Sequence, residues 1–196
     1  MVIVGLTGGI GSGKSTIAKA LKMMGVGIYV CDDEAKRLMN TDAELKRQLS
    51  DLLGKDIYGA EGLNRAKMAE IVFNDPSVLA KVNALVHPCV ANDFRNWAKA
   101  QALGGAKWVV CESAILFESG FNNLADKILV VSLPKELRAQ RAAERDHTTT
   151  EKIERRMKSQ MDDEELRARA DYIISPDDKH LILPQLIELN NRLQQQ

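Results

Sequence analysis

Short apolar runs alternate along this chain with longer segments in which apolar residues recur every three or four positions. Polar or turn-forming residues bound the apolar runs, which lie at 2–6, 26–30, 108–111, 127–132 and 171–175. Continuous apolar runs of this length are typical of parallel strands that are buried on both faces of a sheet. The pattern therefore predicts five buried strands.

The longer segments between these runs have the spacing of helices. After the first run, Ile17, Leu21 and Met24 share one helical face, and Gly25 provides a helix end. Further helices are predicted at 34–53, 64–102, 134–145, 150–168 and 178–194. Strands that alternate with helices predict an α/β fold, in which a five-stranded parallel sheet is flanked by helices through right-handed crossovers.

The interval between the second and third predicted strands is too long for a single crossover. It is mostly helical in pattern, and Pro76 after Asn74 and Asp75 marks a helix start. Ligands of open parallel sheets bind beyond the carboxyl ends of the strands, so inserted helices there are well placed to hold a substrate. We expect one domain over 1–196, with a core at about 1–33, 104–137 and 169–196, a helical acceptor-binding insertion at about 34–103 and a lid at about 138–160.

A glycine-rich loop follows the first predicted strand. Residues 8–15, GGIGSGKS, fit the phosphate-loop pattern GxxxxGK[ST] in full. The glycines let several backbone N–H groups face one point where no Cβ keeps a phosphate away, and the positive end of the following helix adds to this. We expect a nucleoside triphosphate to be bound by Gly9, Ile10, Gly11, Ser12, Gly13, Lys14, Ser15 and Thr16.

Two side chains of this loop carry chemistry of their own. Lys14 is expected to reach the β- and γ-phosphates, and the Ser15 hydroxyl is expected to coordinate Mg²⁺. The pattern is specific for binding of a nucleoside triphosphate. It does not separate kinases from ATPases and GTPases.

The rest of the chain narrows the class of protein. It lacks the N/T-K-x-D element of guanine-reading GTPases, and 196 residues are few for a motor or transporter ATPase. A small-molecule kinase fits, and it requires a base near the acceptor hydroxyl, arginines on the transferred phosphoryl group and a lid that excludes water. A kinase for a nucleoside or nucleotide, and a nucleotide-dependent switch that binds a protein partner, are the alternatives.

Three acidic residues follow predicted strands. Asp32 and Asp33 come directly after the second strand, where a carboxylate can accept the proton of a hydroxyl or cap the next helix. Glu112 ends the third strand, and it can orient Mg²⁺ through water, contact the acceptor or face solvent.

Arginines gather on either side of the loop DHTTT. Arg138, Arg141 and Arg145 are spaced to share one helical face, and Arg155 and Arg156 form a second cluster. Arginine forks bind phosphate bidentately, so the two clusters predict a helical lid that closes on phosphates. A solvated basic face is the alternative.

The histidines, cysteines and overall charge exclude several other functions. The histidines share no metal-ligand spacing, and His87, just before Pro88, is expected to be structural at a helix junction, with a substrate contact as the alternative. Lys plus Arg and Asp plus Glu both number 27, without the basic excess of a nucleic-acid binder. Three cysteines without a CxxC pair, and the absence of a basic leader or long apolar segment, predict a cytoplasmic protein with reduced thiols and no membrane partner.

From Gly5 to about Ser175 the chain resembles the dephospho-CoA kinases. The resemblance lies in an ordered series of motifs: GLTGGIGSGKS at 5–15, LVHP at 85–88, ESAILFE at 112–118, RAAERD at 141–146, RRMKSQM at 155–161 and ADYIIS at 170–175. The phosphate loop alone does not select this family, whereas the order of the later motifs does.

The resemblance implies a kinase that uses ATP and Mg²⁺ to phosphorylate the ribose 3′-hydroxyl of dephospho-CoA, the last step of coenzyme A synthesis. We expect the protein to be a monomer. The family's base, the second Asp of a D-x-D, falls on Asp33, while the first falls on Cys31 with Asp32 between them. Arg141 matches the first lid arginine, which stabilises the transferred charge together with Arg145 or Arg156.

Other positions carry implied roles or departures from the family. Contacts with dephospho-CoA are implied for Asp33, Arg37, His87 and Glu112. The family's Pro after the third strand is Ala114 in this chain, and its Asn near the last loop is replaced around Ser175 and Pro176. These departures concern the contacts with adenine and not the class of reaction.

Overall fold

The structure is a computed structural model that describes residues 1–158, 160–176 and 181–195. It divides into two compact units. Unit 1 comprises Met1–Val30 and Ala98–Gln196, and unit 2 comprises Cys31–Trp97. No helix in the described ranges is both long and apolar enough to cross a membrane.

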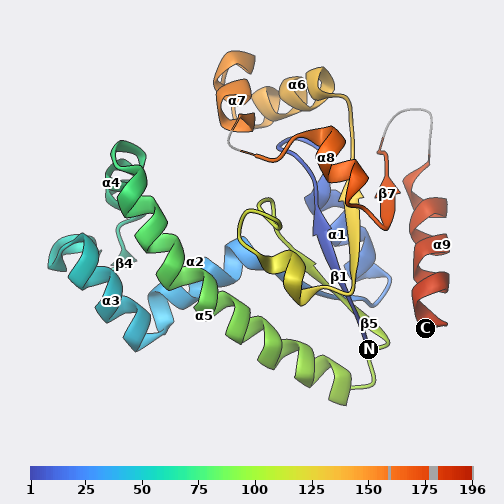
Figure 1. Cartoon of the computed structure of the whole chain (residues 1–196), viewed down its shortest axis with the longest axis horizontal. Helices are drawn as coiled ribbons and strands as arrows, with labels where there is room; N and C mark the ends of the chain where they lie inside the picture. Colours follow the sequence, from blue (N-terminus) through green and yellow to red (C-terminus); the bar gives the residue numbers. More distant parts are fainter. Residues whose placement is uncertain (159, 177–180, 196) are drawn as a thin grey trace. The chain divides into compact units, whose positions relative to one another are not determined.

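Unit 1 is built on a five-stranded parallel sheet with the strand order β2-β5-β1-β6-β7 (Figure 1). The strands are β1 Val2–Thr7, β2 Gly27–Val30, β5 Trp108–Glu112, β6 Lys127–Val131 and β7 Tyr172–Ile174. All four pairings are parallel, which confirms the sheet predicted from the five apolar runs. Glu112 pairs with both Leu6 and Val30, so β1, β2 and β5 end at the same edge of the sheet.

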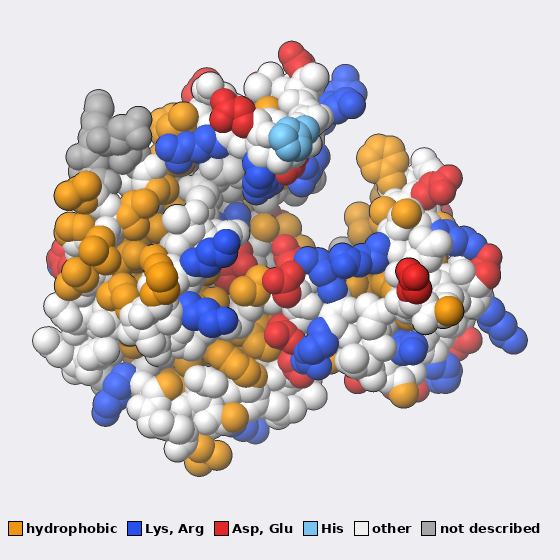
Figure 2. Space-filling model, turned by 180° about the vertical axis from the view of Figure 1, so that it is seen from behind, with side chains coloured by type: hydrophobic (Ala, Val, Ile, Leu, Met, Phe, Trp, Pro, Cys, Tyr) orange, Lys and Arg blue, Asp and Glu red, His pale blue; other side chains and the backbone are white. Residues whose placement is uncertain are grey.

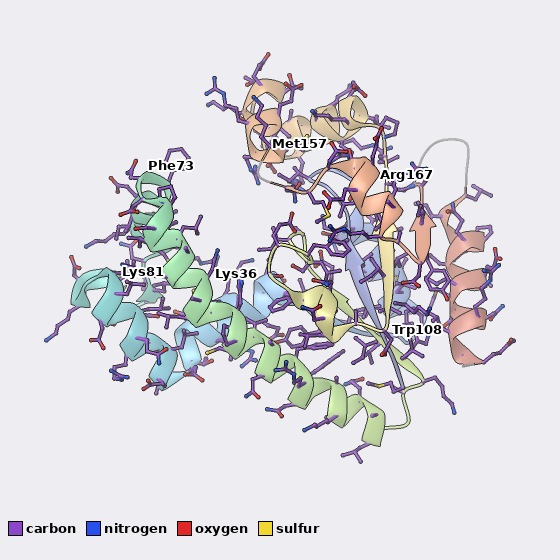
Figure 3. All side chains as sticks on the ribbon, in the orientation of Figure 1. Lys36, Phe73, Lys81, Trp108, Met157 and Arg167 are labelled. Atoms are coloured by element: carbon purple, nitrogen blue, oxygen red, sulfur yellow. The ribbon has the colours of Figure 1, made fainter. Side chains whose placement is uncertain are left out.

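One face of this sheet packs against two helices in a single hydrophobic core. The helices are α1 Lys14–Met23 and α9 Ile182–Gln194, which bury apolar stripes at the spacing of one helical face. Ile17 and Leu21 of α1 and Leu186 and Leu193 of α9 are fully buried. Trp108, labelled in Figure 3, is buried in the same core, and its indole Nε1 donates to Asn190 Oδ1 of α9 at 3.0 Å.

The remaining helices of unit 1 are short. They are η2 Phe121–Leu124, α6 Lys135–Arg145, α7 Thr150–Met157 and α8 Asp163–Ala168. The single helix predicted over 150–168 is therefore wrong. It is interrupted because Asp162 adopts an extended backbone and caps α8, accepting a hydrogen bond from the Glu164 N–H at 2.9 Å. The first residues of the helix predicted at 178–194 lie outside the described part of the chain.

Figure 2 shows one exposed apolar patch of unit 1, where hydrophobic side chains gather over α9. Its large members are Ile173, Leu181, Leu183 and Ile187. Exposed hydrophobic residues are common on folded proteins.

Unit 2 is mainly helical and contains one small hairpin. Its elements are α2 Cys31–Thr41, α3 Ala43–Leu53, η1 Lys55–Ile57, β3 Tyr58–Gly59, β4 Gly62–Leu63, α4 Arg65–Asn74 and the first part of α5 Pro76–Leu103. The prediction of one helix over 34–53 is wrong, because Asp42 ends α2 and caps α3 by accepting a hydrogen bond from the Leu45 N–H at 2.8 Å. The hairpin of β3 and β4 was not predicted, since its strands are only two residues long.

Candidate active site

The phosphate loop joins β1 to α1 at the carboxyl edge of the sheet. Gly13, in the left-handed conformation, is the N-cap of α1, and its carbonyl accepts a hydrogen bond from the Thr16 N–H at 2.9 Å. Ser15 and Thr16 lie exposed in the first turn. Gly11 also has a positive φ of 78°, and a Cβ there would stand 2.1 Å from the Arg138 carbonyl oxygen. Both conditions favour glycine at this position.

Lys14 is buried, and its side chain folds over the loop. Its Nζ donates to the Gly8 carbonyl at 2.6 Å and lies 3.4 Å from the Gly9 carbonyl. The ammonium group is therefore held beside the turn where the sequence predicts phosphate binding.

Ser12 is the clearest sign that the loop is built for a ligand. Its side chain is fully buried, and its Oγ has no hydrogen-bond partner among the described residues. Buried hydroxyl groups are nearly always paired, because leaving one unpaired is costly. A phosphate oxygen would satisfy this hydroxyl, so the loop as folded fits the predicted ligand.

Arg138 is buried, so the alternative of a solvated basic face is wrong for this arginine. It is only 4% exposed and lies against the phosphate loop. Its Nε donates to the Leu133 carbonyl at 3.1 Å, its Nη1 donates to the Ile10 carbonyl at 3.2 Å, and its Nη2 pairs with Asp163. Arg138 is thus part of the support of the loop.

Arg141 contacts Pro176, which lies near the start of α1. Its Nη1 donates to the Pro176 carbonyl at 3.3 Å. The ring of Pro176 would lie 3.6 Å from a Cβ placed on Gly13. Arg141, Pro176 and the N-cap of α1 are therefore gathered in one region of unit 1.

Arg145 and Arg156 are held together by one carboxylate. Arg145 Nε lies 2.7 Å from Asp146, and Arg156 Nη1 lies 2.8 Å from the same carboxylate. These two hydrogen bonds, that of Arg145 first, lower the pKa of Asp146 to about 2. The pair joins α6 to α7 across the loop DHTTT.

Glu112 is buried at 8% exposure, so the solvent-facing alternative for this residue is wrong. The reason is its position in the sheet, because β5 lies between β2 and β1 and both neighbours reach its last residue. The next residue, Ser113, donates its N–H to the Leu6 carbonyl at 3.0 Å. The acid is therefore placed one strand away from the phosphate loop.

In unit 2, Asp32 and Asp33 lie in the first turn of α2, and neither is its N-cap because the helix begins at Cys31. Both side chains are exposed, and Asp33 pairs with Lys36 at 2.7 Å. Figure 3 labels Lys36 on α2. Carboxylates in the first turn of a helix are favoured by its dipole.

Arg37 joins α2 to α5 within unit 2. Its Nη2 lies 2.7 Å from Asp93, and its Nε pairs with Glu34. Hydrogen bonds from these carboxylates, Glu34 first, raise the pKa of Arg37 above its usual range. The guanidinium is thus fixed between two acids.

His87 lies inside α5, not at a helix junction, because the helix continues through Pro88. The predicted junction is therefore wrong. The imidazole is half-buried, and this desolvation lowers its pKa.

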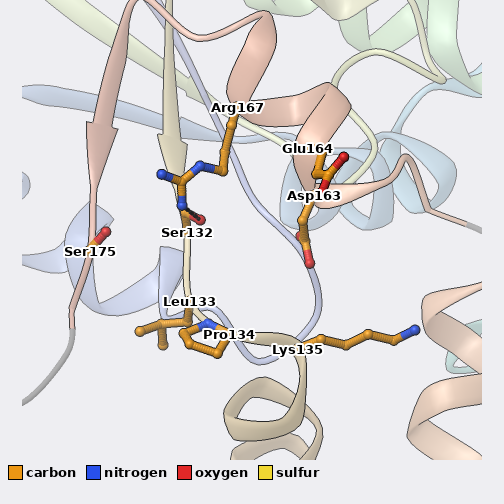
Figure 4. Close-up of a pocket in the computed structure, with 8 residues that line it drawn as sticks. All are labelled: Ser132, Leu133, Pro134, Lys135, Asp163, Glu164, Arg167 and Ser175. Carbon is orange, nitrogen blue, oxygen red and sulfur yellow. Dashed lines mark hydrogen bonds between the residues drawn. The ribbon is translucent and has the colours of Figure 1, made fainter.

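Two cavities lie in unit 1, and one of them adjoins the phosphate loop at Gly9. Asp163 and Arg167 line the other and were not predicted as site residues. One, of about 340 Å³, is lined by Gly9, Arg138, Gln160 and neighbouring residues of the lid segment. The other, of about 530 Å³, is drawn in Figure 4, where Arg167 of α8 reaches Ser132 after β6, with Nη1 3.2 Å from the hydroxyl. Asp163, paired with Arg138, lines both.

Comparisons with known proteins point to one family. The sequence profile of the family "Dephospho-CoA kinase" matches residues 2–181. A dephospho-CoA kinase of Bacteroides fragilis is 39% identical over 186 residues, which cover 95% of this chain and 90% of that protein.

Two solved structures also resemble the chain. A Thermus thermophilus protein has a TM-score of 0.80 at 30% identity and covers 98% of this chain and 95% of its own. A dephospho-CoA kinase from Campylobacter jejuni has a TM-score of 0.72 at 25% identity, with 98% and 97% covered.

Proposed function

The chain belongs to the dephospho-CoA kinase family, and we propose that its phosphate loop, Arg141 and Asp33 carry out the reaction of that family. It is a P-loop kinase that uses ATP to phosphorylate dephospho-CoA in the final step of coenzyme A biosynthesis. The residue roles below are proposals, and the acceptor position is the ribose 3′-hydroxyl.

Unit 1 is proposed to bind ATP. The Ser12 hydroxyl, which has no partner among the described residues, and the Lys14 ammonium lie at one turn of the chain beside the N-terminus of α1. These groups suit a triphosphate, whose oxygens are acceptors and whose charge the helix end and Lys14 offset. The buried Ser12 hydroxyl beside this turn, unpartnered within the described part of the chain, is the observation that carries the assignment.

Magnesium is proposed to bind through the Ser15 hydroxyl, which is exposed in the first turn of α1. Among the described residues, no group of three or more His, Cys, Asp or Glu side chains is arranged to hold a metal ion. This donor set fits an ion that keeps several waters and takes most remaining ligands from phosphate oxygens, as Mg²⁺ does. The bound ion supplies charge neutralisation to the phosphates.

Asp33 is proposed to act on the acceptor. It accepts the proton of the 3′-hydroxyl while that oxygen forms its bond to the γ-phosphorus. The bond from the γ-phosphorus to the bridging oxygen breaks, and ADP leaves with the electron pair. Arg141 stabilises the charge on the transferred group, for which a planar guanidinium is suited. The helices at about 34–103 are proposed to hold the acceptor, with Arg37, His87 and Glu112 in contact with it, and those at about 138–160 to form the lid.

The test is product analysis with the purified enzyme, ATP, Mg²⁺ and a panel of acceptors. Phosphorus and proton NMR should locate the new phosphate on the 3′-oxygen of dephospho-CoA. Adenosine and AMP should be at least about 100-fold poorer acceptors, because they lack the rest of dephospho-CoA, whose binding energy helps to lower the barrier to transfer. Faster phosphorylation of a simple nucleoside would favour the nucleoside-kinase alternative.

A further inference from the structure

Gln160 joins two loops at the carboxyl edge of the sheet in unit 1. Its Oε1 accepts a hydrogen bond from the Ile10 N–H at 2.8 Å, and its Nε2 donates to the Ala114 carbonyl at 3.0 Å. Its own backbone N–H donates to the Met157 carbonyl at 3.1 Å, which holds it to the end of α7. One half-buried side chain therefore connects the lid segment with the loops after β1 and β5.

These two loops follow neighbouring strands that carry the proposed chemistry. The phosphate loop follows β1, and Ala114 follows the buried Glu112 at the end of β5. The strands pair with Leu6 opposite Glu112, so the loops leave the sheet at the same level. A substitution of Gln160 should therefore change the position of the phosphate loop relative to the end of β5.

Residues of the lid segment contact the backbone N–H, the backbone carbonyl and the side chain of Ile10. Its N–H donates to Gln160, and its carbonyl accepts from Arg138 Nη1 at 3.2 Å. Its side chain packs against the apolar cluster of the lid, which includes Ile153 and Met157. Arg138 and Gln160 stand at the two ends of that segment, so both ends fix the same residue of the phosphate loop.

We propose that Gln160 is a positioning residue for phosphoryl transfer, which fixes the tip of the phosphate loop against the end of β5 by acting through Ile10 and Ala114. The inference rests on the proposed assignment of this loop as the ATP site. A glutamine suits the role because a neutral side-chain amide accepts from an N–H group and donates to a carbonyl at the same time. Glutamate and methionine are similar in length but cannot do both near neutral pH.

The first test replaces the amide by a thioether of similar length. Gln160→Met should lower kcat about 10- to 100-fold, the loss expected when reacting groups are displaced slightly. The KM for dephospho-CoA should stay within about twofold, because a positioning residue that acts through the phosphate loop contributes little uniform binding of the acceptor. The matched control is Gln140→Met, since Gln140 is exposed on α6, where its amide faces Glu144 of the same helix at 3.4 Å.

The second test uses pH to restore the missing donor. Gln160→Glu keeps an acceptor for the Ile10 N–H but turns a carboxylate oxygen toward the Ala114 carbonyl. That carbonyl favours the protonated carboxyl, which can donate. The kcat of Gln160→Glu relative to wild type should therefore rise as the pH falls from about 8 to about 5.5. A side chain that only fills space would show a flat ratio.

A third measurement needs no substrate. Hydrogen exchange of the Ile10 amide, followed by NMR, should be at least about tenfold faster in Gln160→Met than in wild type, because its acceptor is lost. Equal exchange, or a kcat for Gln160→Met within about twofold of wild type, would overturn the inference. A wild-type enzyme that failed to phosphorylate dephospho-CoA would instead contradict the proposed function, and the exchange result would still decide the role of Gln160.

Discussion

Gly9→Ala should destabilise unit 1 although Gly9 has no unusual backbone angle. A Cβ at this position would stand 1.9 Å from Arg138 Nη1 and 2.7 Å from its Cζ. The guanidinium would have to move by about 1.5 Å to reach the ordinary contact distance of about 3.5 Å. Such a shift breaks the hydrogen bond to the Ile10 carbonyl and the pairing with Asp163.

The size of the effect follows from the burial of Arg138, which is only 4% exposed. A hydrogen bond to a charged group contributes about 1.5–3 kcal/mol, and breaking a buried ion pair costs about 3–5 kcal/mol. Asp163 is 33% exposed and stays solvated, so the lower part of these ranges applies. We expect a loss of about 3 kcal/mol, equivalent to a melting temperature lower by about 6–12 °C in a chain of this size.

The assay is urea and thermal unfolding of Gly9→Ala beside a matched control. Gly59→Ala introduces the same methyl group where no atom lies within 4 Å, and it should change stability by less than about 0.5 kcal/mol. In an Arg138→Ala background the clash is gone, so Gly9→Ala should then cost less than about 1 kcal/mol. If Gly9→Ala were as mild as Gly59→Ala, or equally costly with and without Arg138, the reasoning would be refuted.

Other predictions test single residues and the lid. Lys14→Ala should lower kcat about 10³-fold or more while the circular dichroism spectrum stays unchanged, because the lysine stabilises developing charge; near-normal turnover would contradict the assignment of the loop. Arg141→Lys keeps the charge but loses the planar fork, so kcat should fall about tenfold in steady-state assays. A wild-type rate would instead favour the alternative in which Arg141 belongs to a solvated basic face. If the segment at about 138–160 is a lid that closes on phosphates, hydrogen exchange over 138–158 should slow when a non-hydrolysable ATP analogue is added, whereas equal protection would argue against closure. Burial lowers the pKa of His87 in the folded protein, whereas in the unfolded chain the imidazole takes up a proton near its ordinary pKa of about 6.5, so the free energy of unfolding should decrease as the pH falls below about 6.5. In His87→Gln the urea midpoint should therefore decrease less than in wild type between about pH 7.5 and 5.5. An equal decrease in both proteins would contradict this prediction.

The sheet could be predicted because its strands are continuous apolar runs. In contrast, Asp42 and Asp162 lie within segments whose helical periodicity continues past them, and only their extended backbone and capping bonds show that one helix ends and another begins. Pro88 caused the opposite error, because it predicted a helix junction where α5 continues through the proline. Local propensity is a weak guide where tertiary structure decides.

The site was predictable only as far as it is local in sequence. The phosphate loop is a contiguous motif, so spacing alone predicts Lys14 and its neighbours as the residues that hold phosphate. Arg138 and Gln160 reach Ile10 across 128 and 150 residues of sequence, and no periodicity reports such contacts. The burial of Glu112 likewise depends on the strand order, which places β5 between two neighbours.

The most direct measurement for the account is a comparison of Asp33→Asn with Asp32→Asn, using calorimetry for ATP binding and a coupled assay for ADP release. If Asp33 is the base, Asp33→Asn should bind a non-hydrolysable ATP analogue within about twofold of wild type and lose about 10²- to 10⁴-fold in kcat, the usual contribution of a general base. Asp32→Asn should lose much less. A crippled Asp32→Asn beside an active Asp33→Asn would contradict the account and move the base by one residue.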